Sequence, residues 1–166
     1  MSAEPVVAAV DIGTNSVKLL VRRGDERRLE TRTVRLGEGV HRSRELQPEP
    51  VARTLSALRE LRELATSSGA SALGAVATSA TRDARNREAF LDAAAEILGT
   101  RPVVLSGEAE GQLAFRGSCV DLPDGVGSPR LLLDIGGGST EFVIGGTALL
   151  GGSAVLGVAS IDVGAI

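Results

Sequence analysis

The chain of 166 residues contains one short pattern twice: an apolar segment that ends in aspartate and is followed by a glycine turn. The first copy is VDIGTNSVKLLV at residues 10–21, and the second is LLLDIGGGSTEFVIG at residues 131–145. When Asp11 is aligned with Asp134, Asp, Ile, Gly and Ser coincide at a constant offset of 123 residues. Apolar segments flank both turns, so the sequence predicts two similar β-hairpins and indicates an internal duplication.

The residue types of both turns are suited to binding phosphate. Glycine has no Cβ and lets backbone N–H groups converge on an anion. An aspartate beside an anion is explained if a hard cation such as Mg²⁺, or its water, lies between the carboxylate and the phosphate. Two ordinary hairpins with glycine turns are the simpler alternative, which the matched aspartates disfavour. The candidate phosphate-binding residues are Gly13, Thr14, Asn15, Ser16, Gly136, Gly137, Gly138, Ser139 and Thr140.

The order of predicted elements indicates an α/β fold. The first three strands follow one another through hairpins, and the later strands alternate with helices, so we expect a mixed sheet. A stretch rich in Pro, Gly and Asp then separates this domain from a second strand–turn–strand unit. We expect strands at 6–10, 17–22, 27–36, 72–77 and 102–105, and helices at 51–68, 86–98 and 106–116, the last two capped by Asn86 and Ser106. We expect a first domain at 1–120, a linker at 121–129 and the start of a second domain at 130–166.

Composition excludes several classes of function. The chain has three Phe, no Trp and no Tyr, and its net charge is -3. Few aromatic side chains are available to stack on bases, and the net charge provides no basic surface. Both observations argue against a nucleic-acid partner. A single cysteine excludes a disulfide framework. No signal peptide and no apolar run long enough to span a bilayer is present, so we expect a cytoplasmic protein without a membrane partner.

Four further polar residues are candidates for the site. Arg82 follows a buried strand, where its guanidinium would hold a phosphate or neutralise charge, or would be solvated in a loop. Glu108 and Glu110 lie in the first turn of a helix, where one of them would activate a water, or both would only complement the helix dipole. Glu141 is either an exposed polar position or a further carboxylate beside the metal. Lys18, which is not one of these candidates, is expected on the open face of its strand.

Four segments in this order resemble the exopolyphosphatase and guanosine pentaphosphate phosphohydrolase (Ppx/GppA) family: VDIGTNSVKLLV, ATSATRDARN, VLSGEAEGQLAFRG and LLLDIGGGSTEFVIG. The resemblance implies a ribonuclease H-like (actin-like ATPase) domain with a mixed sheet and flanking helices, plus the first strands of a second similar domain. It implies that Glu110 is the catalytic carboxylate and that Arg82 matches the arginine of the Thr-x-x-Thr-Arg motif. It also implies Mg²⁺ near Asp134 and Glu141, which Asp11 would face from the first turn. The chain departs from the family pattern at Ala109, Gly111 and Gln112.

The resemblance implies an enzyme that hydrolyses the terminal phosphoanhydride bond of inorganic polyphosphate or of pppGpp. Family members continue through the rest of the second domain, so we expect a truncated chain. The alternatives are a non-catalytic module that binds phosphate or an alarmone, and an ATPase or kinase-like protein of the same fold. A homodimer is a possible assembly.

Overall fold

The first sheet has five strands in the order β3-β2-β1-β4-β5. Strands β1, β2 and β3 form an antiparallel meander, whereas β4 and β5 run parallel to β1. The computed structural model describes residues 4–120, 122, 127–147 and 153–165. The strands are β1 (Val6–Ile12), β2 (Ser16–Arg23), β3 (Glu26–Thr33), β4 (Ala72–Ala77) and β5 (Val103–Val104).

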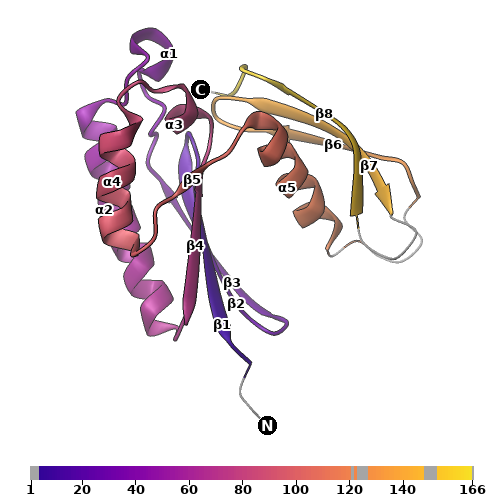
Figure 1. Cartoon of the computed structure of the whole chain (residues 1–166), viewed down its shortest axis with the longest axis horizontal. Helices are drawn as coiled ribbons and strands as arrows, with labels where there is room; N and C mark the ends of the chain where they lie inside the picture. The colour runs from indigo at the N-terminus through magenta and orange to yellow at the C-terminus, as the bar shows by residue number, and fades with distance from the viewer. Residues whose placement is uncertain (1–3, 121, 123–126, 148–152, 166) are drawn as a thin grey trace.

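Two long helices cover one face of this sheet (Figure 1). Alternate residues of β1, from Val6 to Ile12, are buried beneath them, while Val7 on the other face is 42% exposed. This alternation has the two-residue period of a half-covered strand. No helix in the described part of the chain combines the length and apolar composition needed to cross a membrane. The helices are α1 (Val40–Ser43), α2 (Pro48–Ser67), α3 (Ser79–Asp83) and α4 (Arg87–Leu98).

A second, three-stranded antiparallel sheet has the order β6-β7-β8, with β6 (Arg130–Ile135), β7 (Thr140–Thr147) and β8 (Ser153–Ile161). Helix α5 (Gly107–Cys119) lies between the two sheets and packs on the second one (Figure 1). A Cβ added at Gly111 would lie 2.9 Å from Val158 and 3.0 Å from Val143. Glycine therefore allows α5 to approach this sheet closely.

The expected fold class is confirmed: a mixed sheet with flanking helices and the first strands of a similar second unit. The expected first domain included α5, but this helix packs on the second sheet. The division into domains stays a prediction, and most of the linker expected at 121–129 lies outside the described residues.

Local predictions differ from the structure at several places, and the strand expected at 27–36 ends at Thr33. Residues 79–83, expected in a polar connection, form α3, and α1 was not expected. Asn86 precedes α4 but does not cap it with its side chain, because its amide instead donates to the Leu46 carbonyl at 3.0 Å and accepts from the Leu46 N–H at 2.8 Å. Ser106 does cap α5, since its hydroxyl accepts from the Ala109 N–H.

Candidate phosphate-binding and catalytic site

The two glycine turns, residues 13–16 and 136–139, have the same backbone geometry. The Gly13 N–H donates to the Ser16 carbonyl at 3.0 Å, and the Gly136 N–H donates to the Ser139 carbonyl at 2.9 Å. A Cβ at either glycine would lie about as close to that same carbonyl oxygen, at 2.9 and 3.1 Å, so both turns favour glycine at their first position. The duplication seen in the sequence is therefore also a duplication of structure.

The strands that flank the turns align in the same way. Asp11 is paired with Lys18 across β1 and β2, and Asp134 is paired with Glu141 across β6 and β7. Both members of each pair lie on one face of their sheet, because directly opposed residues share a face. Lys18 and Glu141 thus occupy equivalent positions with opposite charge.

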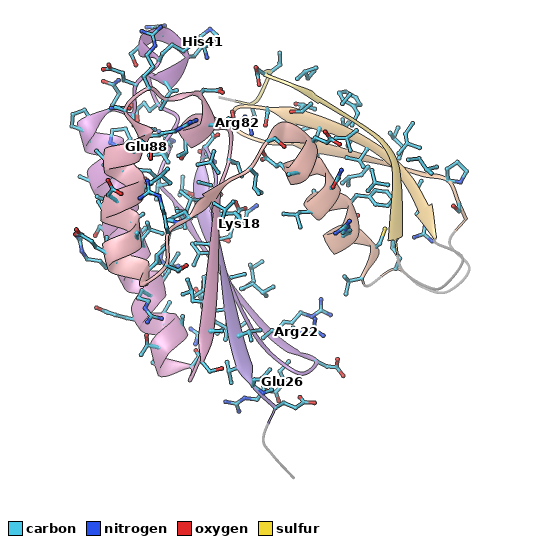
Figure 2. All side chains as sticks on the ribbon, in the orientation of Figure 1. Lys18, Arg22, Glu26, His41, Arg82 and Glu88 are labelled. Carbon is cyan, nitrogen blue, oxygen red and sulfur yellow. The ribbon has the colours of Figure 1, made fainter. Side chains whose placement is uncertain are left out.

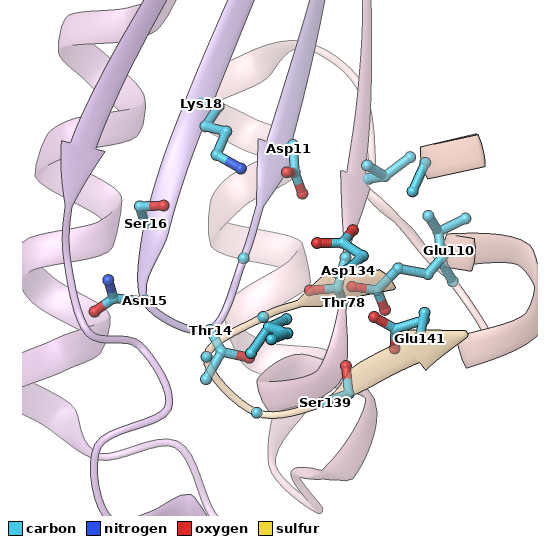
Figure 3. Close-up of a pocket in the computed structure, with 18 of the residues that line it drawn as sticks. Asp11, Thr14, Asn15, Ser16, Lys18, Thr78, Glu110, Asp134, Ser139 and Glu141 are labelled. Carbon is cyan, nitrogen blue, oxygen red and sulfur yellow. The ribbon is translucent and has the colours of Figure 1, made fainter. Parts of the chain in front are cut away.

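The two turns touch each other. Thr14 is buried, and its hydroxyl accepts from the Ala80 N–H at the start of α3 over 3.2 Å. A Cβ at Gly138 would lie 2.6 Å from the Ser79 hydroxyl and 3.1 Å from that of Thr14, so only a residue without a side chain allows this approach. Both turns line one cavity of about 520 Å³ between the sheets (Figure 3).

The cavity is rich in negative charge. Its described lining residues include the carboxylates of Asp11, Glu110, Asp134 and Glu141 and a single cationic group, that of Lys18. In Figure 3, Glu110, Asp134 and Glu141 lie together on one side, and Asp11 and Lys18 lie on adjacent strands opposite. An anion that enters this cavity must be accompanied by positive charge, because like charges close together repel strongly in a partly desolvated site.

The pKa of Asp11 lies above its ordinary value. Burial is the main cause, and the nearby Asp134 carboxylate adds to it, whereas Lys18 acts in the opposite direction. One carboxylate oxygen of Asp11, Oδ1, is buried without a hydrogen-bond partner. A buried polar atom without a partner is costly to the fold and is typical of a functional site.

Helix α5 places Glu110 at the cavity wall. The Glu110 N–H donates to the Ser106 carbonyl, which starts the helix, and its side chain accepts from Nη1 of Arg82 at 3.1 Å. The same Nη1 donates to the Leu105 carbonyl at 3.1 Å. Burial raises the pKa of Glu110; the hydrogen bond from Arg82 lowers it, and the charges of Glu141 and Asp11 raise it further.

Glu141 is 1% exposed, so of the two alternatives for this residue the exposed polar position is excluded. The Ser160 hydroxyl on β8 donates to its Oε1 at 2.9 Å. The hydrogen bond fixes one oxygen of a carboxylate that still lines the cavity.

Most of the predicted site residues meet at this cavity, but two do not line it. Arg82 faces Glu110, and the Thr140 hydroxyl donates to the Val163 carbonyl at 2.7 Å. Thr78 and Lys18 line the cavity but were not among the predicted site residues. The repeat offset would have identified Lys18, because it places this residue opposite Asp11 as Glu141 is opposite Asp134.

The described residues contain no cluster of three or more His, Cys, Asp or Glu side chains able to hold a metal ion by themselves. Mg²⁺ commonly binds through one or two carboxylates and otherwise keeps water or substrate phosphate oxygens. The unpartnered oxygen of Asp11 and the Asp134 carboxylate suit that second mode. The residues therefore fit a cation that the substrate helps to bind.

The strand order of the first sheet and the paired glycine turns place the chain in the actin-like ATPase class of folds. The Ppx/GppA phosphatase family model matches residues 27–166, and the chain belongs to this family. Over 153 residues it is 42% identical to exopolyphosphatase 2 of Mycobacterium tuberculosis, covering 84% of this chain and 48% of that protein.

Solved structures of this family are similar to the chain, and two of them serve as examples. An exopolyphosphatase-like protein matches with a TM-score of 0.86 and 36% identity, over 98% of this chain and 52% of that one. The Ppx/GppA family member of Aquifex aeolicus matches with a TM-score of 0.77 and 31% identity, over 96% of this chain and 52% of that one. The chain thus spans about half the length of the relatives that it matches.

Proposed function

We propose that this chain carries the phosphate-binding and catalytic half-site of a phosphoanhydride hydrolase that releases phosphate from the end of inorganic polyphosphate or of pppGpp. One observation carries the proposal: two equivalent glycine turns and Glu110, whose pKa is raised, line the same cavity. Family membership supports hydrolysis of polyphosphate in general terms.

The glycine turns would bind the terminal phosphate. The donors would be the hydroxyls of Thr14, Ser16 and Ser139, which line the cavity, and the backbone N–H groups of the turns other than those of Gly13 and Gly136, which donate within the turns. Donors held in place before the reaction stabilise the charge that develops on phosphoryl oxygens without having to reorganise. Lys18 would add positive charge on the first-sheet side, where Figure 2 shows it away from α2 and α4.

Glu110 would act as the general base. It accepts a proton from a water molecule whose oxygen attacks the terminal phosphorus, while the bond from that phosphorus to the bridging oxygen breaks. The electron pair of the broken bond stays on the bridging oxygen, which leaves with the shortened polyphosphate or nucleotide. A carboxylate with a raised pKa is a better proton acceptor than one in water, and burial supplies that shift for Glu110.

Arg82 would position this base. Its guanidinium is shared between Glu110 and the Leu105 carbonyl, so it fixes where the carboxylate points. Because Arg82 does not line the cavity, a direct contact with substrate is the less favoured role.

Mg²⁺ is the proposed cofactor, which Asp11 and Asp134 would hold with the help of the substrate phosphate. When bound, such a cation neutralises phosphate charge and acts as a Lewis acid. Four carboxylates against one lysine in the cavity lining support this requirement.

The test is phosphate release from polyphosphate, pppGpp and ATP by this chain with Mg²⁺, alongside Glu110→Gln and the exposed control Glu108→Gln. We expect release from polyphosphate or pppGpp, a loss of about 100-fold or more in Glu110→Gln, and no change in the control. Unchanged hydrolysis in Glu110→Gln would refute the role of the base. Tight binding of substrate without release by the wild-type chain would favour a binding module, and a preference for ATP would favour a kinase-like ATPase.

A further inference from the structure

Behind each glycine turn runs a short segment that follows the third strand of its sheet. Residues 34–37 follow β3 and hold the first turn, because the N–H groups of Val34 and Arg35 donate to the Asn15 carbonyl at 2.9 Å. The Gly37 N–H donates to the Thr14 carbonyl, also at 2.9 Å. We call residues 34–37 the first brace.

Residues 162–165, which follow β8, bond to the second turn and to the first residue of β7. The Thr140 hydroxyl donates to the Val163 carbonyl at 2.7 Å, and the Ala165 N–H donates to the Gly136 carbonyl at 3.0 Å. We call residues 162–165 the second brace. These bonds explain why Thr140 does not face the cavity.

A glycine stands at the closest approach of each brace to its turn. A Cβ at Gly37 would overlap Cγ2 of Thr14, and a Cβ at Gly164 would overlap the backbone of Gly137 and Gly138. Neither Gly37 nor Gly164 has a positive φ, so space and not backbone conformation requires glycine here.

The two contacts are equivalent in the internal repeat. Thr14 and Gly137, the residues against which the braces press, are separated by the same 123 residues as the aspartates. Each duplicated unit therefore consists of a turn, a third strand and a brace with a glycine. The brace lies outside the stretch in which the two sequences are visibly alike.

We propose that Gly37 and Gly164 are positioning residues, each of which lets a brace pack directly behind a glycine turn and so sets where the amide groups of that turn lie in the cavity. The proposal rests on the proposed phosphate-binding function and names residues that determine its geometry. Displacement of such donors by a fraction of a bond length weakens binding because hydrogen-bond energy depends steeply on distance and angle.

The first brace can be tested with a double-mutant cycle of Gly37→Ala and Thr14→Ser. Serine keeps the hydroxyl of Thr14 but lacks Cγ2, the atom that the new methyl group would overlap. The readout is the affinity for inorganic tripolyphosphate in the presence of Mg²⁺, measured by calorimetry. We expect Gly37→Ala to weaken binding about tenfold in the wild-type background and much less in the Thr14→Ser background. Equal losses in both backgrounds would overturn the proposal for Gly37.

No compensating substitution is available for the second brace, because a Cβ at Gly164 would meet backbone atoms and not a side chain. We expect Gly164→Ala to weaken tripolyphosphate binding at least as much as Gly37→Ala. Gly157→Ala on β8 is the matched control, since a Cβ there meets no atom within 4 Å. Equal affinities for Gly164→Ala and Gly157→Ala would overturn the proposal for Gly164.

Amide hydrogen exchange of the ligand-free protein separates this proposal from the proposed function. We expect Gly37→Ala to speed exchange at Gly13 and Gly164→Ala to speed it at Gly136, each without affecting the other turn. If the wild-type chain binds no tripolyphosphate but the two variants show this exchange pattern, the proposed function is refuted and the role of the braces stands. Exchange that rises evenly over the whole chain would show a general loss of stability and refute the braces.

Discussion

Arg82 connects Glu110 to the residue that follows strand β5: its Nη1 lies 3.1 Å from Oε2 of Glu110 and 3.1 Å from the Leu105 carbonyl oxygen. Burial raises the pKa of the Glu110 carboxyl group, and the hydrogen bond from Arg82 lowers it. The pair therefore sets both the direction and the proton affinity of the proposed base.

Arg82→Ala should raise the pKa of Glu110, because it removes the group that opposes the effect of burial. A base is active when ionised, so the acid limb of the rate profile should move to higher pH, with kcat roughly tenfold lower near that limb. Phosphate release measured against pH checks this. Arg85→Ala is the control, since Arg85 is an exposed arginine of the same segment. A limb that stays in place, or moves to lower pH, would contradict the assigned role.

Asp11→Asn should stabilise the fold at neutral pH while it weakens Mg²⁺-dependent phosphate binding. The pKa of Asp11 is raised in the folded state. The contribution of this group to stability is therefore fully present below its unfolded-state pKa and is lost as pH rises through its folded-state pKa. The variant does not titrate, and its advantage should be about 1 kcal/mol above that window and vanish below it. Thermal unfolding from pH 3 to 8 measures the difference, and an advantage that grows as pH falls would contradict the expected sign.

The repeat in the sequence predicted the two turns because their geometry depends on local residue types. Gly13 and Gly136 are favoured by contacts within four residues, and such contacts are visible in a short motif. The strand periodicity was equally local, which is why the mixed sheet could be predicted from the order of its elements.

Features that depend on distant segments were missed, misread or left open. Asn86 has the residue type of a helix cap, but Leu46 from a remote loop offers its amide both a donor and an acceptor. For Glu141 the alternation along its strand left an exposed position and a site carboxylate both open, and only the packing of α5 decides between them. Both outcomes depend on tertiary packing, which a single segment of sequence does not contain.

Two glycines of α5 should respond oppositely to alanine. Gly111→Ala should lower the free energy of unfolding by about 1–3 kcal/mol, because the new methyl group would press on Val143 and Val158. Gly117→Ala should raise it by up to about 1 kcal/mol, since a Cβ there meets nothing within 4 Å and alanine favours helix. Urea unfolding of both variants measures this pair. Stabilisation by Gly111→Ala would show that α5 does not pack closely on the second sheet.

Ser160→Ala should destabilise the fold because it removes the hydroxyl that donates to the buried Glu141 carboxylate at 2.9 Å. We expect a loss of about 1–3 kcal/mol, since a buried charged acceptor without its donor keeps its full desolvation cost. In a Glu141→Gln background the loss should be smaller, because a neutral amide is less costly to leave unpaired. Ser67→Ala, which removes an exposed hydroxyl that donates to the Leu64 carbonyl, is the control and should change stability by less than about 0.5 kcal/mol. Equal losses for Ser160→Ala in both backgrounds would mean that this hydroxyl acts through packing and not through Glu141.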